Sequence, residues 1–287
     1  MKIGVLIRYS KAEVDWLVAE GFGSCQLLIW AGDPLDPNVK GNDRELEVAR
    51  EYLAERAIEV SAVGAYPNLL DPDASKARKN QAHLRSLIPV CRKLGVKTLC
   101  TFAGRIPDKD LLDNIPAFRK VFSPIVRRVE DAGMRLAFEN CPMFHSFPFR
   151  GVNIAYTPVA WDAMFEAIPS EAMGLEYDPS HLICLLIDPV QTIYDYGQKI
   201  FHVHAKDAEV IWGNVRRNGI LEHGAVRHRV PGLGQADWRE IISALVEVGY
   251  RGNLDIEGRH DPVFGGELEK VGLRIAKKHL EQFVMQG

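Results

Sequence analysis

The sequence predicts an α/β protein that folds as a (β/α)8 TIM barrel, with residues 1–287 forming a single domain. Two observations lead to this fold class. Short apolar runs alternate with longer amphipathic stretches along the whole chain, as in βα units around a parallel sheet. Eight such units in 287 residues match the size of a closed barrel. A doubly wound open sheet is the alternative, which the lack of a GxGxxG motif in the first turn disfavours.

The eight apolar runs are the predicted strands. They lie at 2–7, 25–30, 57–64, 96–102, 134–140, 173–178, 200–206 and 253–258. The amphipathic stretches predict helices near 11–20, 43–56, 73–94, 115–132, 157–167, 189–198, 237–248 and 266–285. Glycine stands where several of these helices should end, as in "LGV" at 94–96 and "DAGM" at 131–134. No linker or domain boundary interrupts the pattern.

Two connections are longer than the short loops of a compact domain. Residues 141–156 follow the fifth strand and residues 207–236 follow the seventh. In a barrel both would lie over the C-terminal face, where barrel enzymes keep their active sites. The first connection is rich in aromatic residues, which suits either a wall over a small ligand or simple loop packing. Its aromatic residues are Phe144, Phe147, Phe149 and Tyr156.

Composition and charge disfavour several classes of protein. A net charge of -3 and a pI near 6.3 give no basic surface for a nucleic-acid backbone, so no nucleic-acid partner is expected. Five widely spaced cysteines without a CxxC motif suggest neither a disulfide framework nor a zinc knuckle, which fits a reducing compartment. No apolar run suits a signal peptide or approaches the ~20 residues of a membrane span. We expect a soluble cytoplasmic protein, and a homo-oligomer stays open.

The stretch "IFHVHAKD" at 200–207 raises a question of function. It reads as a buried strand, yet it places His202, His204 and Lys206 on one face, because successive strand side chains point to opposite faces. Each of these groups is costly to bury without a partner. They are either hydrogen-bonded core residues or part of a site.

Polar residues also end the fifth, sixth and eighth predicted strands. They are Glu139, Asn140, Glu176, Asp178, Asp255 and Glu257. In a barrel these groups form a ring around one mouth, where close carboxylates raise one another's pKa unless a cation lies between them. An imidazole with several carboxylates suits one divalent ion, Mn²⁺ before Zn²⁺, Co²⁺ or Mg²⁺. Asp178 has an alternative role as the N-cap of a helix that begins at "PSHL".

Five motifs, "FENCP", "YDPSHL", "FHVHAKD", "VPGLGQADW" and "DIEG", end the fifth to eighth units in that order. With them the chain resembles the xylose isomerase-like barrel superfamily, specifically its sugar phosphate isomerase/epimerase branch. The resemblance is strong over residues 134–260 and rests on the βα rhythm alone before them. It implies that His181 points to the substrate and that His202 is a barrel-interior neighbour. It also implies four metal ligands, which are Glu139, Asp178, His204 and Glu257.

Barrels of the endonuclease IV type, which repair abasic DNA, share these motifs but bind three zinc ions through additional histidines. The corresponding stretches here, "AYPNLL" and "TFAGR", contain no histidine. "VRHRVPGLG" offers His228 but has no aspartate two residues before it. Only one full metal site remains, which favours a small-molecule enzyme over a nuclease.

The resemblance implies a metal-dependent isomerase or epimerase that acts on a small carbohydrate. In similar epimerases two glutamates on opposite sides of the substrate transfer the proton, so Glu139 and Glu257 are the expected acid and base. A divalent ion would stabilise the enediolate that develops. A dehydratase acting on a keto-inositol or keto-sugar is the alternative. A DNA-repair endonuclease or a sugar-binding protein without turnover comes third.

Two basic positions complete the expected site. Lys206 is expected either to neutralise a hydroxyl or carboxylate of the substrate or to pair with Asp207, and the pairing is slightly favoured. Arg229, with Arg227 beside the "VPGLG" loop, is expected either to bind a phosphate or acid group or to be a solvated loop residue.

Overall fold

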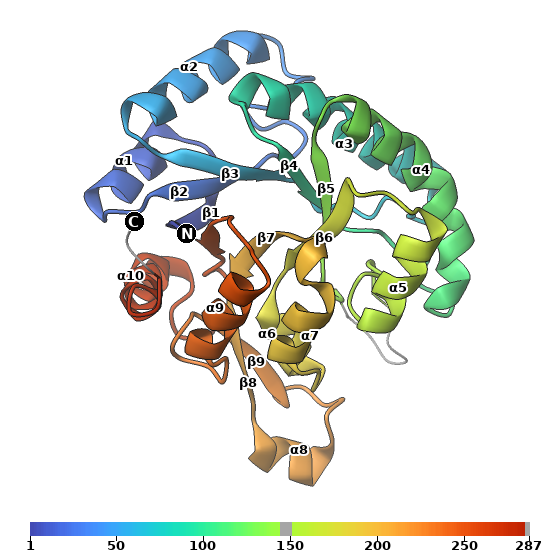
Figure 1. Ribbon diagram of the computed structural model, residues 1–287, viewed down its shortest axis with the longest axis vertical. Helices are drawn as coiled ribbons and strands as arrows, with labels where there is room; N and C mark the ends of the chain where they lie inside the picture. The colour runs from blue at the N-terminus through green and yellow to red at the C-terminus, as the bar shows by residue number, and fades with distance from the viewer. Residues whose placement is uncertain (144–150, 285–287) are drawn as a thin grey trace.

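A computed structural model describes residues 1–143 and 151–284 of the chain. In these residues eight parallel strands close into a barrel in the order β1-β10-β7-β6-β5-β4-β3-β2 (Figure 1). The strands are β1 (Ile3–Ile7), β2 (Ser24–Leu28), β3 (Glu59–Gly64), β4 (Thr98–Thr101), β5 (Arg135–Glu139), β6 (Met173–Tyr177), β7 (Ile200–Ala205) and β10 (Leu254–Ile256). The predicted single-domain TIM barrel is confirmed.

Helices follow the strands along the chain and surround the barrel (Figure 1). They are α1 (Lys11–Ala19), α2 (Asn42–Glu55), α3 (Ala74–Leu94), α4 (Ile115–Asp131), α5 (Pro158–Ala167), α7 (Pro189–Tyr196), α9 (Trp238–Glu247) and α10 (Glu269–Leu280). Short 3₁₀ turns, η1 (Leu112–Asn114), η2 (Gly197–Lys199) and η3 (Gly266–Leu268), precede three of the later elements. Within the described ranges, no helix combines the length and the apolar character that crossing a membrane requires.

The hydrophobic core lies between the helices and the barrel, and it sets which side chains point inward. Phe118 and Phe122 share one face of α4, because residues four apart in a helix are neighbours. Both pack on Phe138 of β5, with ring centroids 5.5 and 5.0 Å apart. Side chains alternate along a strand, so Glu139 points to the opposite side, into the barrel. The apolar face of α4 therefore helps to aim Glu139 at the barrel axis.

The helix ends follow local signals in the sequence. Ser10 caps α1, because its Oγ accepts a hydrogen bond from the backbone N–H of Glu13 at 3.1 Å. Gly95 ends α3 with a φ of 73°, a left-handed conformation that favours glycine. The glycine stop predicted at 94–96 is thus confirmed.

The connection after β7 is a folded excursion, where the sequence predicted a loop. Its strands β8 (Asp207–Val210) and β9 (Val226–Arg229) pair antiparallel, and α8 (Trp212–Asn218) lies between them. The excursion extends away from the barrel (Figure 1). Asp207 holds the beginning and the end of the excursion together. Its carboxylate accepts hydrogen bonds from the N–H groups of Gly234 at 3.2 Å and Ala236 at 2.9 Å. Gly234 is required there, since a Cβ would overlap that carboxylate.

A short helix follows β6, and a gap in the described residues follows β5. A short helix, α6 (Pro179–Cys184), begins after β6, where the alternative role of Asp178 as an N-cap placed a helix start. After β5, the described chain resumes at residue 151. Phe144, Phe147 and Phe149, which the sequence suggested as a wall over a ligand, lie outside the described residues.

Candidate active site

Four side chains that the sequence predicted as metal ligands meet at the C-terminal mouth of the barrel. Each offers one donor atom, and these atoms all lie within 4.8 Å of one another. Three are fully buried and the fourth is half-buried. The residues are Glu139, Asp178, His204 and Glu257, and we call them the four-residue cluster.

Asparagine side chains hold the ends of β5 and β6 in place beneath this cluster. Asn140 donates to the carbonyl of Asp178 at 2.8 Å and accepts from its N–H at 2.7 Å. Asn153 donates to the carbonyl of Glu139 at 2.8 Å. Both asparagines are fully buried, so their hydrogen bonds are needed to offset the loss of water. The two strand ends are thereby fixed with Glu139 and Asp178 on the same side.

The two carboxylate oxygens of Asp178 have different surroundings. Its Oδ1 accepts from the N–H of Ser180 at 2.8 Å and caps α6, as one interpretation of the sequence proposed. Its Oδ2 is buried and has no hydrogen-bond partner among the described residues. A buried carboxylate oxygen that accepts no hydrogen bond is costly, and a bound cation would remove that cost.

The ring of His204 is oriented by the barrel interior. Its Nε2 lies 2.6 Å from Gln26 Oε1 and 3.0 Å from Glu176 Oε1. Because both of these oxygens accept, Nε2 carries the proton. Nδ1 faces the cluster, 3.1 Å from Glu139 Oε1. Partners of this kind fix the ring of a metal-binding histidine and raise its basicity.

Lys206 joins the cluster through a partner that the sequence did not identify. Its Nζ donates to Glu257 Oε2 at 2.8 Å and lies 4.0 Å from Asp178 Oδ2. The pairing of Lys206 with Asp207, which the sequence slightly favoured, is wrong. Both carboxylate oxygens of Asp207 instead accept backbone N–H groups of the excursion after β7.

The two other predicted substrate-binding residues lie in different surroundings. His181, the third residue of α6, has its Nε2 3.3 Å from Asp178 Oδ2 and 3.9 Å from Glu139 Oε1. Arg229 is bound by two carboxylates, with its Nε 3.0 Å from Asp261 and its Nη1 3.5 Å from Glu209. These ion pairs give Arg229 a structural role, and its binding of a substrate group stays a prediction.

Burial and the nearby charges shift the acid strengths in the cluster. Burial raises the pKa of Glu139 to about 7, although His204 opposes it. Burial also raises the pKa of Asp178 to about 6. Burial would raise the pKa of Glu257 as well, but the ammonium of Lys206 outweighs it and lowers the value to about 2. Two of the carboxyl groups therefore hold protons readily near neutral pH.

The donor set fits a divalent metal ion. Three carboxylates and one imidazole are ligands that Mn²⁺, Zn²⁺, Co²⁺ and Mg²⁺ accept, with the oxygen-rich set closest to the preference of Mn²⁺. Two features favour a cation between the four side chains. The buried Oδ2 of Asp178 accepts no hydrogen bond from the described residues, and Nδ1 of His204 faces the cluster because Gln26 holds the other ring nitrogen.

Metal binding is expected to weaken as the pH falls from about 8 to about 6. Glu139, with a pKa of about 7, and Asp178, with a pKa of about 6, take up protons over this range, and the ion binds only their ionised forms. For each of these two carboxyl groups, the affinity for the ion falls about tenfold per pH unit below the pKa of the group, because the ion must displace its proton. Titration calorimetry with Mn²⁺ at several pH values measures this. An affinity that is constant over the range would contradict the assignment of these two ligands.

His202 lies one layer deeper in the barrel, and both of its ring nitrogens meet carboxylates. Nδ1 is 3.0 Å from Glu176 Oε1 and Nε2 is 2.8 Å from Asp255 Oδ2. Burial would lower the pKa of His202, but these two carboxylates raise it. Asp255 Oδ2 also accepts from the hydroxyl of Ser61. This environment agrees with the prediction that His202 is a barrel-interior neighbour.

Gln26 and Tyr66 connect this inner layer to the cluster, and neither role was predicted from the sequence. Gln26 Nε2 donates to Glu176 Oε1 at 2.6 Å, and the hydroxyl of Tyr66 donates to Glu176 Oε2 at 2.8 Å. Each is a single polar residue in or beside an apolar run, so nothing in the pattern separates it from an ordinary core residue. Cross-barrel proximity is the signal that identifies them.

A second group of donor atoms, from Cys100, Glu176 and His202, also lies within 4.8 Å. Burial raises the pKa of the Cys100 thiol well above its usual value, which keeps it protonated. Both nitrogens of His202 are engaged by carboxylates. We therefore assign this group to the hydrogen-bonded interior of the barrel.

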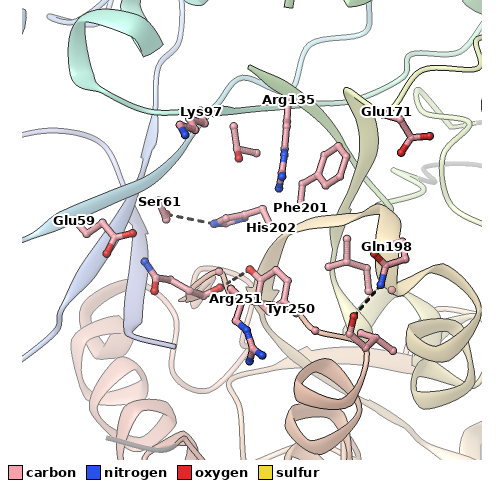
Figure 2. Close-up of a pocket in the computed structure, with 17 residues that line it drawn as sticks. Glu59, Ser61, Lys97, Arg135, Glu171, Gln198, Phe201, His202, Tyr250 and Arg251 are labelled. Carbon is pink, nitrogen blue, oxygen red and sulfur yellow. Dashed lines mark hydrogen bonds between the residues drawn. The ribbon is translucent and has the colours of Figure 1, made fainter. Parts of the chain in front are cut away.

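Cavities lie at both ends of the barrel. One of about 520 Å³ adjoins the cluster at the C-terminal mouth and includes His181 and Lys206 in its wall. The other, of about 820 Å³, lies at the N-terminal end, with Glu59, Lys97 and Arg135 around it and His202 nearer its centre (Figure 2). Active sites of such barrels lie at the C-terminal face, and the four-residue cluster is there too. The candidate site is therefore the one at the C-terminal mouth.

A (β/α)8 barrel that gathers three carboxylates and an imidazole at its strand ends is the architecture of a barrel enzyme with a candidate metal centre. The chain belongs to the xylose isomerase-like TIM barrel family, whose model matches residues 14–281. The resemblance found in the sequence is confirmed.

Two sequence relatives and one solved structure show what the chain is similar to. The chain is 25% identical to the uncharacterized protein YfiH of Bacillus subtilis (strain 168), over 90% of this chain and 88% of that protein. It is 26% identical to the inosose dehydratase of Geobacillus kaustophilus (strain HTA426), over 54% of this chain and 48% of that enzyme. The fold matches D-psicose 3-epimerase from Clostridium cellulolyticum H10 with a TM-score of 0.71 and 18% identity, over 99% and 98% of the two chains. The chain is thus similar in sequence to a dehydratase and in fold to an epimerase.

Proposed function

We propose that the protein is a divalent-metal-dependent isomerase or epimerase of a small sugar or sugar derivative. One observation carries the proposal. Glu139 at the end of β5 and Glu257 directly after β10 belong to the same cluster of donor atoms within 4.8 Å. Carboxylates from different strands of a barrel reach a substrate between them from different sides. Such a pair can remove a proton from one side of a carbon and return it on the other.

The chemistry follows from the weak acidity of a hydrogen next to a carbonyl. Its removal needs a positioned base and stabilisation of the oxygen that gains negative charge. Asp178, His204 and the two glutamates would hold a divalent ion, which would supply that stabilisation as a Lewis acid. Glu139 and Glu257 take up the proton and give it back. The hydrogen bond from His204 to Gln26 holds the imidazole in place while they do so.

We propose that two further side chains, His181 and Lys206, bind substrate oxygens. His181 Nε2 has no hydrogen-bond partner among the described residues. Burial lowers the pKa of His181 well below its usual value, so the ring is neutral and can pair with a hydroxyl. Burial opposes the charge of Lys206, but Glu257 and Asp178 raise its pKa and keep it cationic. We expect Lys206 to donate to a carbonyl or hydroxyl oxygen of the substrate.

A dehydratase is the second candidate, and the match to an inosose dehydratase favours it. The same proton abstraction next to a carbonyl starts both reactions. An epimerase or isomerase returns the proton, whereas a dehydratase expels the hydroxyl on the neighbouring carbon as water. The products therefore differ by the mass of one water molecule.

A screen of ketoses, keto-inositols and their phosphates with metal-replete protein in D₂O tests the proposal. We expect one compound to take up solvent deuterium at the carbon next to its carbonyl and to give a product that differs from it in mass only by the exchanged deuterium. Loss of water would favour the dehydratase. Cleavage of abasic DNA, with no deuterium uptake in any sugar, would contradict the proposal.

A further inference from the structure

The cleft of about 520 Å³ beside the four-residue cluster has two sides of different chemistry. The side next to the cluster is polar. Lys206 on this side lies 2.8 Å from Glu257, and His181 lies 3.3 Å from Asp178. His228 of β9 extends the same side, with its ring centroid 4.9 Å from that of His181. The cleft therefore offers room for a ligand that extends from the cluster.

The other side of the cleft is apolar and comes from segments outside the barrel strands. The end of α6 and the turn after it contribute Leu185 and Leu186, and the connection between α8 and β9 contributes Ile220 and Leu221. Leu186 is 53% exposed and Leu221 is 51% exposed. Large apolar side chains exposed to water beside an active site are unfavourable. A ligand that covers them removes apolar surface from water, and this stabilises the complex. We call these four residues the apolar wall.

The backbone of Leu186 shows that this side chain is kept there at a cost. Leu186 has a φ of 59°, in the left-handed region where glycine is the usual residue at a helix end. The hydrogen bond from Ile187 N–H to the carbonyl of Leu182, at 2.9 Å, holds the turn. Met143, with a φ of 50°, lines the same cleft. Strained residues persist mainly at functional sites, where they place a side chain that the function needs.

A free sugar does not match this cleft. It carries hydroxyl groups around its whole ring, and those turned toward the apolar wall would lose water without gaining a hydrogen-bond partner. We propose that the substrate is a sugar or cyclitol derivative with an apolar substituent, which binds against Leu185, Leu186, Ile220 and Leu221. Its carbonyl end lies at the cluster, so this inference rests on the proposed function.

Matched pairs of compounds test the inference. Each pair is a ketose or keto-cyclitol and its phenyl ether or phenyl glycoside, with the phenyl group remote from the carbonyl. We expect the phenyl member to bind Mn²⁺-loaded protein about tenfold more tightly and to take up solvent deuterium with a correspondingly higher kcat/KM. Leu221→Asn should remove most of this preference. Leu112→Asn is the matched control, because Leu112 is 49% exposed and does not line the cleft.

The possible outcomes distinguish a failure of the inference from a failure of the proposed function. Equal binding and turnover of free and phenyl-substituted members would overturn the inference and leave the proposed function standing. A preference that survives in Leu221→Asn would also overturn it, because the substituent would then bind elsewhere. If no member of any pair exchanged deuterium or lost water, the proposed function would fail, and the inference with it.

Discussion

Glu139→Gln and Glu257→Gln are each expected to lower turnover by about 10² to 10⁴ at saturating Mn²⁺. Glutamine keeps the shape of the side chain and one oxygen for the ion, but it cannot accept a proton. The two glutamates belong to one cluster within 4.8 Å and come from different strands, so neither can take over the task of the other. The measurement is kcat together with solvent-deuterium uptake on the substrate that the screen identifies.

Glu171→Gln is the matched control for these variants. Glu171 is 99% exposed and lies at the N-terminal end of the barrel, so its variant should keep full turnover. Substrate affinity should survive in all three proteins. Near wild-type turnover in Glu139→Gln or Glu257→Gln, with metal bound, would contradict proton transfer by the two glutamates, even if the metal site is correct.

His204→Ala and His202→Ala are expected to fail in different ways. His204 faces the cluster through Nδ1, so its loss removes one of four ligands and should lower Mn²⁺ affinity by at least about 100-fold. His202 lies between Glu176 and Asp255, and its loss leaves two buried carboxylates without their shared partner. That variant should lower the free energy of unfolding by about 3–5 kcal/mol. Calorimetry with Mn²⁺ and denaturant unfolding separate the two effects.

His223→Ala serves as the control, because His223 is exposed in the excursion after β7 and its loss should change stability by less than about 0.5 kcal/mol. The expected order of metal affinity places His204→Ala well below His202→Ala. Equal losses in the two variants would mean that the ligand histidine is assigned wrongly.

The fold and the four-residue cluster could be predicted because both depend on order along the chain. Apolar runs in regular alternation define the barrel, and the residue after the last apolar position of a strand must lie at the mouth. Glu139 shows this directly, since Phe138 before it packs on α4. The short strands β8 and β9 were missed, because four residues each are too few for a clear alternation.

Contacts across the barrel could not be predicted in the same way. Lys206 pairs with Glu257, which is 51 residues away, and the adjacent Asp207 looked like the simpler partner. Gln26 lies 178 residues from His204, whose proton it accepts. The apolar wall comes from a turn with a positive φ and from a connection outside the barrel, and neither carries a periodic pattern. These features depend on the closed three-dimensional barrel.

The metal content of the purified protein tests the central claim most directly. Native mass spectrometry after gentle purification, followed by saturation with Mn²⁺, counts the ions on each chain. We expect about one divalent ion per wild-type chain and a large loss of it in His204→Ala, since the four-residue cluster forms one site. A wild-type protein that holds no ion under these conditions would contradict the account. About three ions per chain would also contradict it and would favour the nuclease.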